Sequence, residues 1–150
     1  ALKSILQTRC MNVIREKEGG TYAVNVNESV VHEPVARYYL IVEFQCDPSN
    51  ASRLKGIVLG ELERLRQQAP TRDELMMALN SIRKKEGEAR ETNVYWQEKL
   101  VLYYKTGLNQ ADAREFEEVV DKLTPADFLS FMQYFWKDID LTGVVFKPAN

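Results

Sequence analysis

The spacing of apolar residues predicts one amphipathic helix and then two strands in the first third of the chain. From Leu2 to Ile14 the apolar residues recur every three or four positions, which is typical of a helix with one buried face, and Gly19-Gly20 would end it. In residues 22–27 and 37–46, by contrast, one apolar face recurs at every second position, which predicts strands. One face of the second strand is wholly apolar: Tyr38, Leu40, Val42, Phe44 and Cys46. Such strands favour an antiparallel pair with one face covered by helices.

Two further helices are predicted in the middle of the chain. Asp47-Pro48 combines a capping residue with a proline suited to a first helical turn, so a helix is expected from there to Ala69-Pro70. Thr71-Arg72-Asp73-Glu74 has the pattern of a capping box. A long helix should therefore run from Thr71 to about Thr106, bent near Gly87 or Asn93, and end at Gly107.

The last third predicts two shorter helices and a closing strand. The first helix carries an apolar stripe, the second begins at residues 124–127, and residues 141–147 have the composition of a strand that Pro148 would stop. The stripe consists of Phe116, Val119, Val120 and Leu123. Because the order α β β α α α α β separates strands from helices, it predicts an α+β fold with an antiparallel sheet and helices packed on one face. The length of 150 residues is enough for one domain with its own core.

Composition excludes several classes of partner. Charged residues make up 28% of the chain, but both signs are mixed and the net charge is −2, which argues against a nucleic-acid binder. No apolar run approaches the length of a membrane span, so no membrane partner is expected. Cys10 and Cys46 are far apart in sequence and predict neither a disulfide framework nor a metal site. The two cysteines do not indicate the cellular compartment of the protein.

Two side chains that flank a predicted turn at Gly19-Gly20 are candidates for substrate binding. Arg15 and Tyr22 lie seven residues apart, on opposite sides of Gly19-Gly20. A guanidinium and a phenol can both donate hydrogen bonds to a peptide carbonyl or a developing oxyanion, and two glycines allow the sharp turn that would aim them together. The plain alternative is a solvated arginine in the last helical turn, favoured by the helix dipole, and a strand tyrosine with its hydroxyl at the surface.

The order of these features resembles the second, non-zinc half of the pitrilysin/insulinase-family zinc peptidases, also described as mitochondrial-processing-peptidase-like or inverted zincins. The corner from Arg15 to Tyr22 carries the resemblance, together with the strand 37–46 and the helix starts at 47–48, 71–75 and 124–127. It implies that residues 1–150 are a single domain fragment, the later part of a peptidase C-terminal domain truncated at its N-terminus. It also implies that Arg15 and Tyr22 bind the backbone and the oxyanion of an extended peptide substrate.

The same resemblance implies zinc, but in another half or subunit of the parent enzyme. The family motif H-x-x-E-H needs two histidines, and this chain has one, His32, beside Glu33-Pro34 in an expected turn. We therefore expect no zinc in this chain and no activity from it alone. A second interpretation is a non-catalytic structural or substrate-binding partner subunit of the same family. A third is a scaffold domain without peptide function.

Truncation would leave a sheet edge unpaired. The family's domain has strands before the first helix, and their absence predicts self-association of the isolated chain through an exposed sheet edge.

Two further clusters receive structural interpretations. The aromatic pairs Tyr95-Trp96 and Tyr103-Tyr104 and the group at 131–136 have helical spacing, which favours core or helix–helix contacts over a carbohydrate or nucleic-acid site. The alternating charges of residues 83–91, with Glu86 and Arg90 spaced for an ion pair, predict a solvated helix face.

Overall fold

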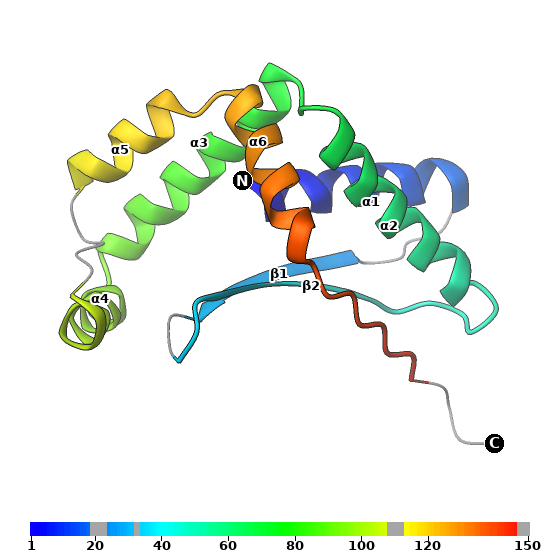
Figure 1. Cartoon of the computed structure of the whole chain (residues 1–150), viewed down its shortest axis with the longest axis horizontal. Helices are drawn as coiled ribbons and strands as arrows, with labels where there is room; N and C mark the ends of the chain where they lie inside the picture. Colours follow the sequence, from blue (N-terminus) through cyan, green and yellow to red (C-terminus); the bar gives the residue numbers. More distant parts are fainter. Residues whose placement is uncertain (19–23, 32–33, 108–112, 147–150) are drawn as a thin grey trace.

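The computed structural model describes residues 1–18, 24–31, 34–107 and 113–146. It contains six helices and a two-stranded antiparallel sheet within those residues, and the helices form a layer over one side of the sheet (Figure 1). The elements are α1 (Leu2–Glu18), β1 (Val24–Val31), β2 (Arg37–Phe44), α2 (Ala51–Gln67), α3 (Arg72–Arg90), α4 (Asn93–Thr106), α5 (Ala113–Lys122), α6 (Pro125–Phe135) and a 3₁₀ turn, η1 (Trp136–Asp138). The predicted α+β class is confirmed.

The sheet has one covered face and one open face. Val24 pairs with Phe44 and Val31 with Arg37, so all eight residues of each strand are opposed. Val24 and Val26 are buried, and the apolar face predicted for β2 is half-buried against the core. Tyr39 and other residues on the opposite face are exposed, which confirms that helices cover one side only.

The core is built around α1. Leu6, Cys10 and Ile14 are completely buried, as the helical spacing predicts, and α1 packs on β1, α2 and α3. Leu54 and Leu65 contribute from α2, which also packs on α6.

The helix predicted to start at Asp47-Pro48 begins later, at Ala51. The Asp47 carboxylate accepts hydrogen bonds from the Ser49 backbone N–H, at 2.8 Å, and from the Ser49 hydroxyl. It therefore closes a local turn instead of capping a helix, which is the competing use of an aspartate at such a position.

The long helix predicted from Thr71 to Thr106 is two helices. The capping box is present, with Thr71 and Glu74 in their expected roles, but the helical conformation is interrupted at Glu91–Thr92. The Thr92 hydroxyl accepts from the Tyr95 N–H at 3.3 Å and so begins α4 next to the expected bend at Asn93. Gly107 ends α4 with φ at 74°, a left-handed conformation that glycine adopts without strain.

The prediction of a closing strand at 141–147 is wrong for residues 141–146, the part of it that the structure describes. Residues 141–146 are in no strand and in no backbone hydrogen bond with another described residue. They run as a single stretch from the end of α6 toward the C-terminus (Figure 1). A strand-like composition does not make a strand unless another strand lies beside it.

No helix in the described ranges is both long and apolar enough to cross a bilayer.

Candidate functional site

The predicted corner is only partly visible. Arg15 lies in α1, near its C-terminal end, while its side chain and the whole of Tyr22 fall outside the described residues. The structure therefore neither brings the guanidinium and the phenol together nor separates them. What it does define is how firmly the helix that carries Arg15 is held.

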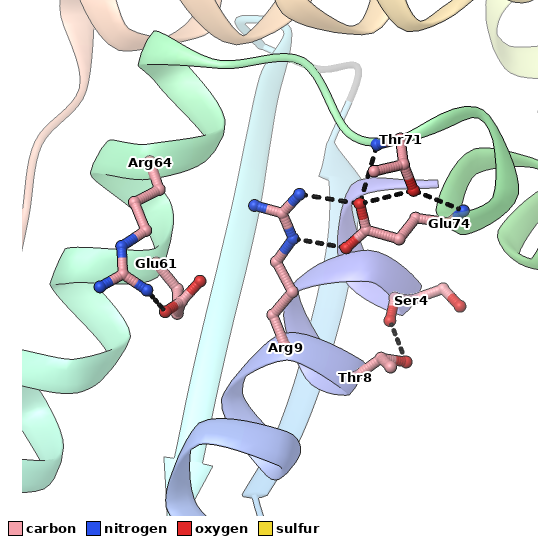
Figure 2. A network of polar contacts seen from close by, with 7 residues as sticks. All are labelled: Ser4, Thr8, Arg9, Glu61, Arg64, Thr71 and Glu74. Carbon is pink, nitrogen blue, oxygen red and sulfur yellow. Dashed lines mark hydrogen bonds and ion pairs between the residues drawn. The ribbon is translucent and has the colours of Figure 1, made fainter.

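An ion pair fixes α1 against α3. Arg9 on α1 donates from Nε to Glu74 Oε1 at 2.8 Å and from Nη2 to Glu74 Oε2 at 2.9 Å (Figure 2). The two planar groups thus meet through two parallel hydrogen bonds, the strongest arrangement that this pair can make. The pair is part-buried, with 20% of the Arg9 side chain and 31% of the Glu74 side chain exposed.

Glu74 serves the helix start and the ion pair at the same time. Its Oε2 also accepts from the Thr71 backbone N–H, at 2.8 Å, and from the Thr71 hydroxyl, at 3.1 Å (Figure 2). The hydrogen bonds from Arg9 and then those from Thr71 stabilise the charged carboxylate and lower the pKa of Glu74 to about 2, against some opposition from burial. The same contact raises the pKa of Arg9. Glu74 is therefore a fixed anion that sets the angle between two helices, and it is a poor proton carrier at neutral pH.

A second carboxylate lies deeper, on the side of α2 that faces α1. Glu61 is 4% exposed and accepts a hydrogen bond from Arg64 Nη1 one turn further along the same helix (Figure 2). Burial, followed by the negative charge of Glu61, raises the pKa of the Cys10 thiol to about 12. Cys10 therefore stays protonated and cannot act as a nucleophile at neutral pH.

A shallow groove of about 230 Å³ lies between α1 and α2 beside this carboxylate. Its walls are Val13, Arg53, Gly56, Ile57, Gly60, Glu61 and Arg64. Positions 13 and 15 of a helix lie about 200° apart around its axis. The groove lies on the side of α1 that carries Val13, and position 15 is on another side of that helix.

A larger cleft of about 470 Å³ lies where α3 meets α5 and the start of α6. Its floor is apolar, with Leu75, Leu79 and Val120, and Arg72 and Arg83 stand at its edges. Arg83 is held by Glu117, at 3.0 Å, and by Asp121, so its charge is already neutralised within the protein. This cleft can accept an apolar side chain, but it offers no group placed for catalysis.

The aromatic residues predicted as core or helix contacts are mostly at the surface. Tyr95 is buried, but Tyr103 and Tyr104 are 50% and 83% exposed, and Tyr134 on α6 is 75% exposed. For Tyr103 and Tyr104 the reason is the position of α4, which packs chiefly on α3 at one end of the helical layer (Figure 1). Most of the circumference of α4 consequently has no neighbour in the described structure.

The predicted solvated face is present over most of the charged run, where Lys84, Lys85, Glu88 and Glu91 are exposed, but the predicted Glu86–Arg90 pair is less exposed than the rest. Glu86 and Arg90 do pair, at 2.9 Å, but each side chain is only about one-fifth exposed, at 21% and 19%. Tyr95 donates its hydroxyl hydrogen bond to Glu86, and Arg90 lies over the Tyr95 ring at 5.4 Å from its centroid. Burial and the contact with Glu86 raise the pKa of Tyr95 to about 12. These residues fix the elbow between α3 and α4.

Within the described ranges, no group of three or more His, Cys, Asp or Glu side chains is placed to hold a metal ion. His32 lies outside those ranges. The residues of this chain therefore do not fit a zinc site of the H-x-x-E-H type, which needs a second histidine that the sequence lacks.

Sequence reasoning missed both part-buried carboxylate contacts. Glu74 was recognised only as a helix cap, and the one available signal for its second role was Arg9 among the apolar positions of the first helix. Glu61 falls on the apolar face of its helix, in helical spacing with Val58 and Leu65, and that spacing is the signal that could have marked it as buried.

Comparison with known proteins gives a distant similarity. No family model matches the chain. A protein described as "Zinc protease PQQL-like" from Arabidopsis thaliana is 22% identical over 116 residues, which cover 74% of this chain and 12% of that protein. The chain thus spans about an eighth of the relative's length. The similarity supports a relationship to a zinc peptidase and leaves the role of each residue open.

Proposed function

We propose that this chain is the substrate-binding, non-zinc portion of a zinc metalloendopeptidase of the pitrilysin/insulinase type that cleaves extended peptides. The observation that carries the proposal is the similarity to a zinc protease along 74% of a chain that contains only one histidine. A peptidase-related chain that cannot build the zinc motif is best explained as the part of such an enzyme that binds substrate. Zinc is then held by another half or by a separate subunit.

Arg15 and Tyr22 are the residues that we assign to this role. The Tyr22 hydroxyl would donate a hydrogen bond to the carbonyl oxygen as negative charge develops on it, and Arg15 would hold the substrate backbone. The firm seating of α1 favours the assignment for Arg15. Two parallel hydrogen bonds from Arg9 to Glu74 and the fully buried Leu6, Cys10 and Ile14 fix the helix from which Arg15 extends.

Peptide binding by the chain itself tests the first half of the proposal. Fluorescence polarisation with labelled, unstructured peptides should show saturable binding that Arg15→Ala weakens, because the guanidinium is assigned to the peptide backbone. Lys85→Ala is the control, since Lys85 is an exposed cation on α3 that lines neither the groove nor the cleft. No saturable binding, or equal losses in the two variants, would contradict the assignment.

Hydrolysis by the full-length parent protein tests the second half. Loss of one oxyanion donor typically lowers the rate by about 10²-fold, so Tyr22→Phe should lower kcat/KM by about that factor. Tyr104→Phe, which alters an 83% exposed tyrosine on α4, should leave it unchanged. Peptide binding without hydrolysis by the parent would instead favour the interpretation as a non-catalytic subunit of the same family.

A further inference from the structure

The helix that carries position 15 is held by two kinds of contact. Leu6, Cys10 and Ile14 are completely buried and attach α1 to the core through apolar surface. Apolar burial has no preferred direction, so by itself it defines the rotation of a helix about its own axis only loosely. Hydrogen bonds weaken steeply when their angles change, so a hydrogen-bonded contact defines that rotation more sharply.

The ion pair of Arg9 with Glu74 is a contact of this directional kind. It lies where α1 touches α3, a smaller contact than those of α1 with β1 and α2. The two parallel hydrogen bonds, at 2.8 and 2.9 Å, orient the guanidinium as well as hold it (Figure 2).

Glu74 is itself prevented from following a movement of α1. Its Oε2 accepts the Thr71 backbone N–H at 2.8 Å, which holds the carboxylate against the first turn of α3 (Figure 2). The next residue, Leu75, is buried in the core and anchors that turn. The pair therefore ties α1 to a fixed point on another helix.

The rotation of α1 matters at position 15, which lies six residues beyond Arg9 in the same helix. Six residues correspond to about 9 Å along the axis and place the two positions about 120° apart around it. Side chains reach about 5–6 Å from a helix axis, so a rotation of about 10° moves a group at the rim by about 1 Å. A misplacement of that size can lower the rate at a substrate site by about 100-fold.

We propose that Arg9 and Glu74 are positioning residues for the substrate site assigned to Arg15. The pair fixes the rotation of α1 against α3, and with it the direction in which residue 15 extends toward a peptide. This role rests on the proposed function, because it needs Arg15 to bind the peptide backbone. It makes the affinity of the site depend on a contact that lies two helical turns away and does not itself touch the peptide.

Fluorescence polarisation of the chain with a fluorescein-labelled casein peptide tests this role. Arg15→Ala should raise the Kd by about 10-fold or more, the value of one hydrogen bond to a charged group. Glu74→Gln should raise it by about 3-fold, half of that effect on a free-energy scale, because a displaced guanidinium keeps part of its contact. Arg9→Met should have an effect similar to that of Glu74→Gln, and the two changes together should have no larger one, since both remove the same contact.

Thr71→Ala separates positioning from stability. It removes the hydroxyl of the capping box, so it should destabilise the chain to an extent similar to Glu74→Gln, but it leaves both hydrogen bonds from Arg9 in place. Its Kd should therefore match that of the native chain. Urea unfolding verifies that each variant is folded under the conditions of the binding assay.

A double-mutant cycle between positions 15 and 74 gives a readout that a general loss of stability would not produce. In the Arg15→Ala background, Glu74→Gln should weaken binding no further, because it acts only through Arg15. An equal loss in both backgrounds, or native affinity in Glu74→Gln while Arg15→Ala binds weakly, would overturn the positioning role and leave the proposed function intact. Native affinity in Arg15→Ala, or no binding by the native chain, would overturn the proposed function and the positioning role with it.

Discussion

Removing the charge of Glu74 should loosen α1 from α3 without removing the helix cap. In Glu74→Gln the amide can still serve the capping box, because glutamine is accepted at that position, but the charge that holds Arg9 is lost. The change therefore isolates the ion pair from the cap.

The expected size follows from the pKa of Glu74. Its lowering from 4.5 to about 2 would correspond to about 3 kcal/mol at about 1.4 kcal/mol per pKa unit. Because 31% of the Glu74 side chain is exposed, solvent screens part of that energy, and we expect a loss of about 1–2 kcal/mol in the free energy of unfolding near neutral pH.

The direction of the pH dependence is fixed by the same lowering. A carboxylate with a lowered pKa in the folded state contributes its full stability above its unfolded-state pKa and loses it as the pH falls toward the folded-state value. Urea unfolding should therefore show the native chain more stable than Glu74→Gln above about pH 5, and the difference should shrink from about pH 4.5 to about pH 2.

Two comparisons make this test decisive. Glu88→Gln, which breaks an exposed pair with Lys84 at 3.8 Å, should cost less than about 0.5 kcal/mol. In a double-mutant cycle, Arg9→Met and Glu74→Gln should be clearly non-additive, since they remove the same contact. Additive losses, or a difference from the native chain that is the same at acid and neutral pH, would refute the reasoning.

Two other predictions concern backbone strain and thiol reactivity. Gly107→Ala should destabilise by about 1 kcal/mol, because φ at 74° strains any residue with a Cβ, whereas Gly87→Ala inside α3 should be neutral or stabilising; thermal unfolding measures both, and equal effects would contradict the difference. Cys10 should react with a thiol reagent much more slowly than Cys46, because Cys10 is buried and its pKa is raised to about 12; equal rates in the native state would contradict its burial.

Some of the sequence predictions failed because their signals have more than one use. Asp47 has the side chain of a helix cap and instead closes a turn with Ser49, so α2 begins at Ala51. Residues 141–146 have strand composition, but no strand lies beside them in the described structure. Tyr103 and Tyr104 have the spacing of core residues, yet α4 lies at the margin of the helical layer and leaves them exposed. The assignment of Arg15 and Tyr22 stays a prediction.

What the sequence determined by itself is local. The capping box of Thr71 with Glu74, the helix start at Thr124, the helix end at Gly107 and the apolar face of β2 all appear as predicted. Each depends on residues a few positions apart, so neighbouring side chains and backbone groups suffice to specify it.

Only the tertiary structure decided which distant groups meet. It placed Arg9 against Glu74, 65 residues further along the chain, and it left residues 141–146 without a strand partner among the described residues. Hydrogen bonds and burial between distant segments depend on how whole helices pack and on which strands lie side by side. No local pattern contains that information, because the free energy of each contact is set by a partner that the local sequence does not name.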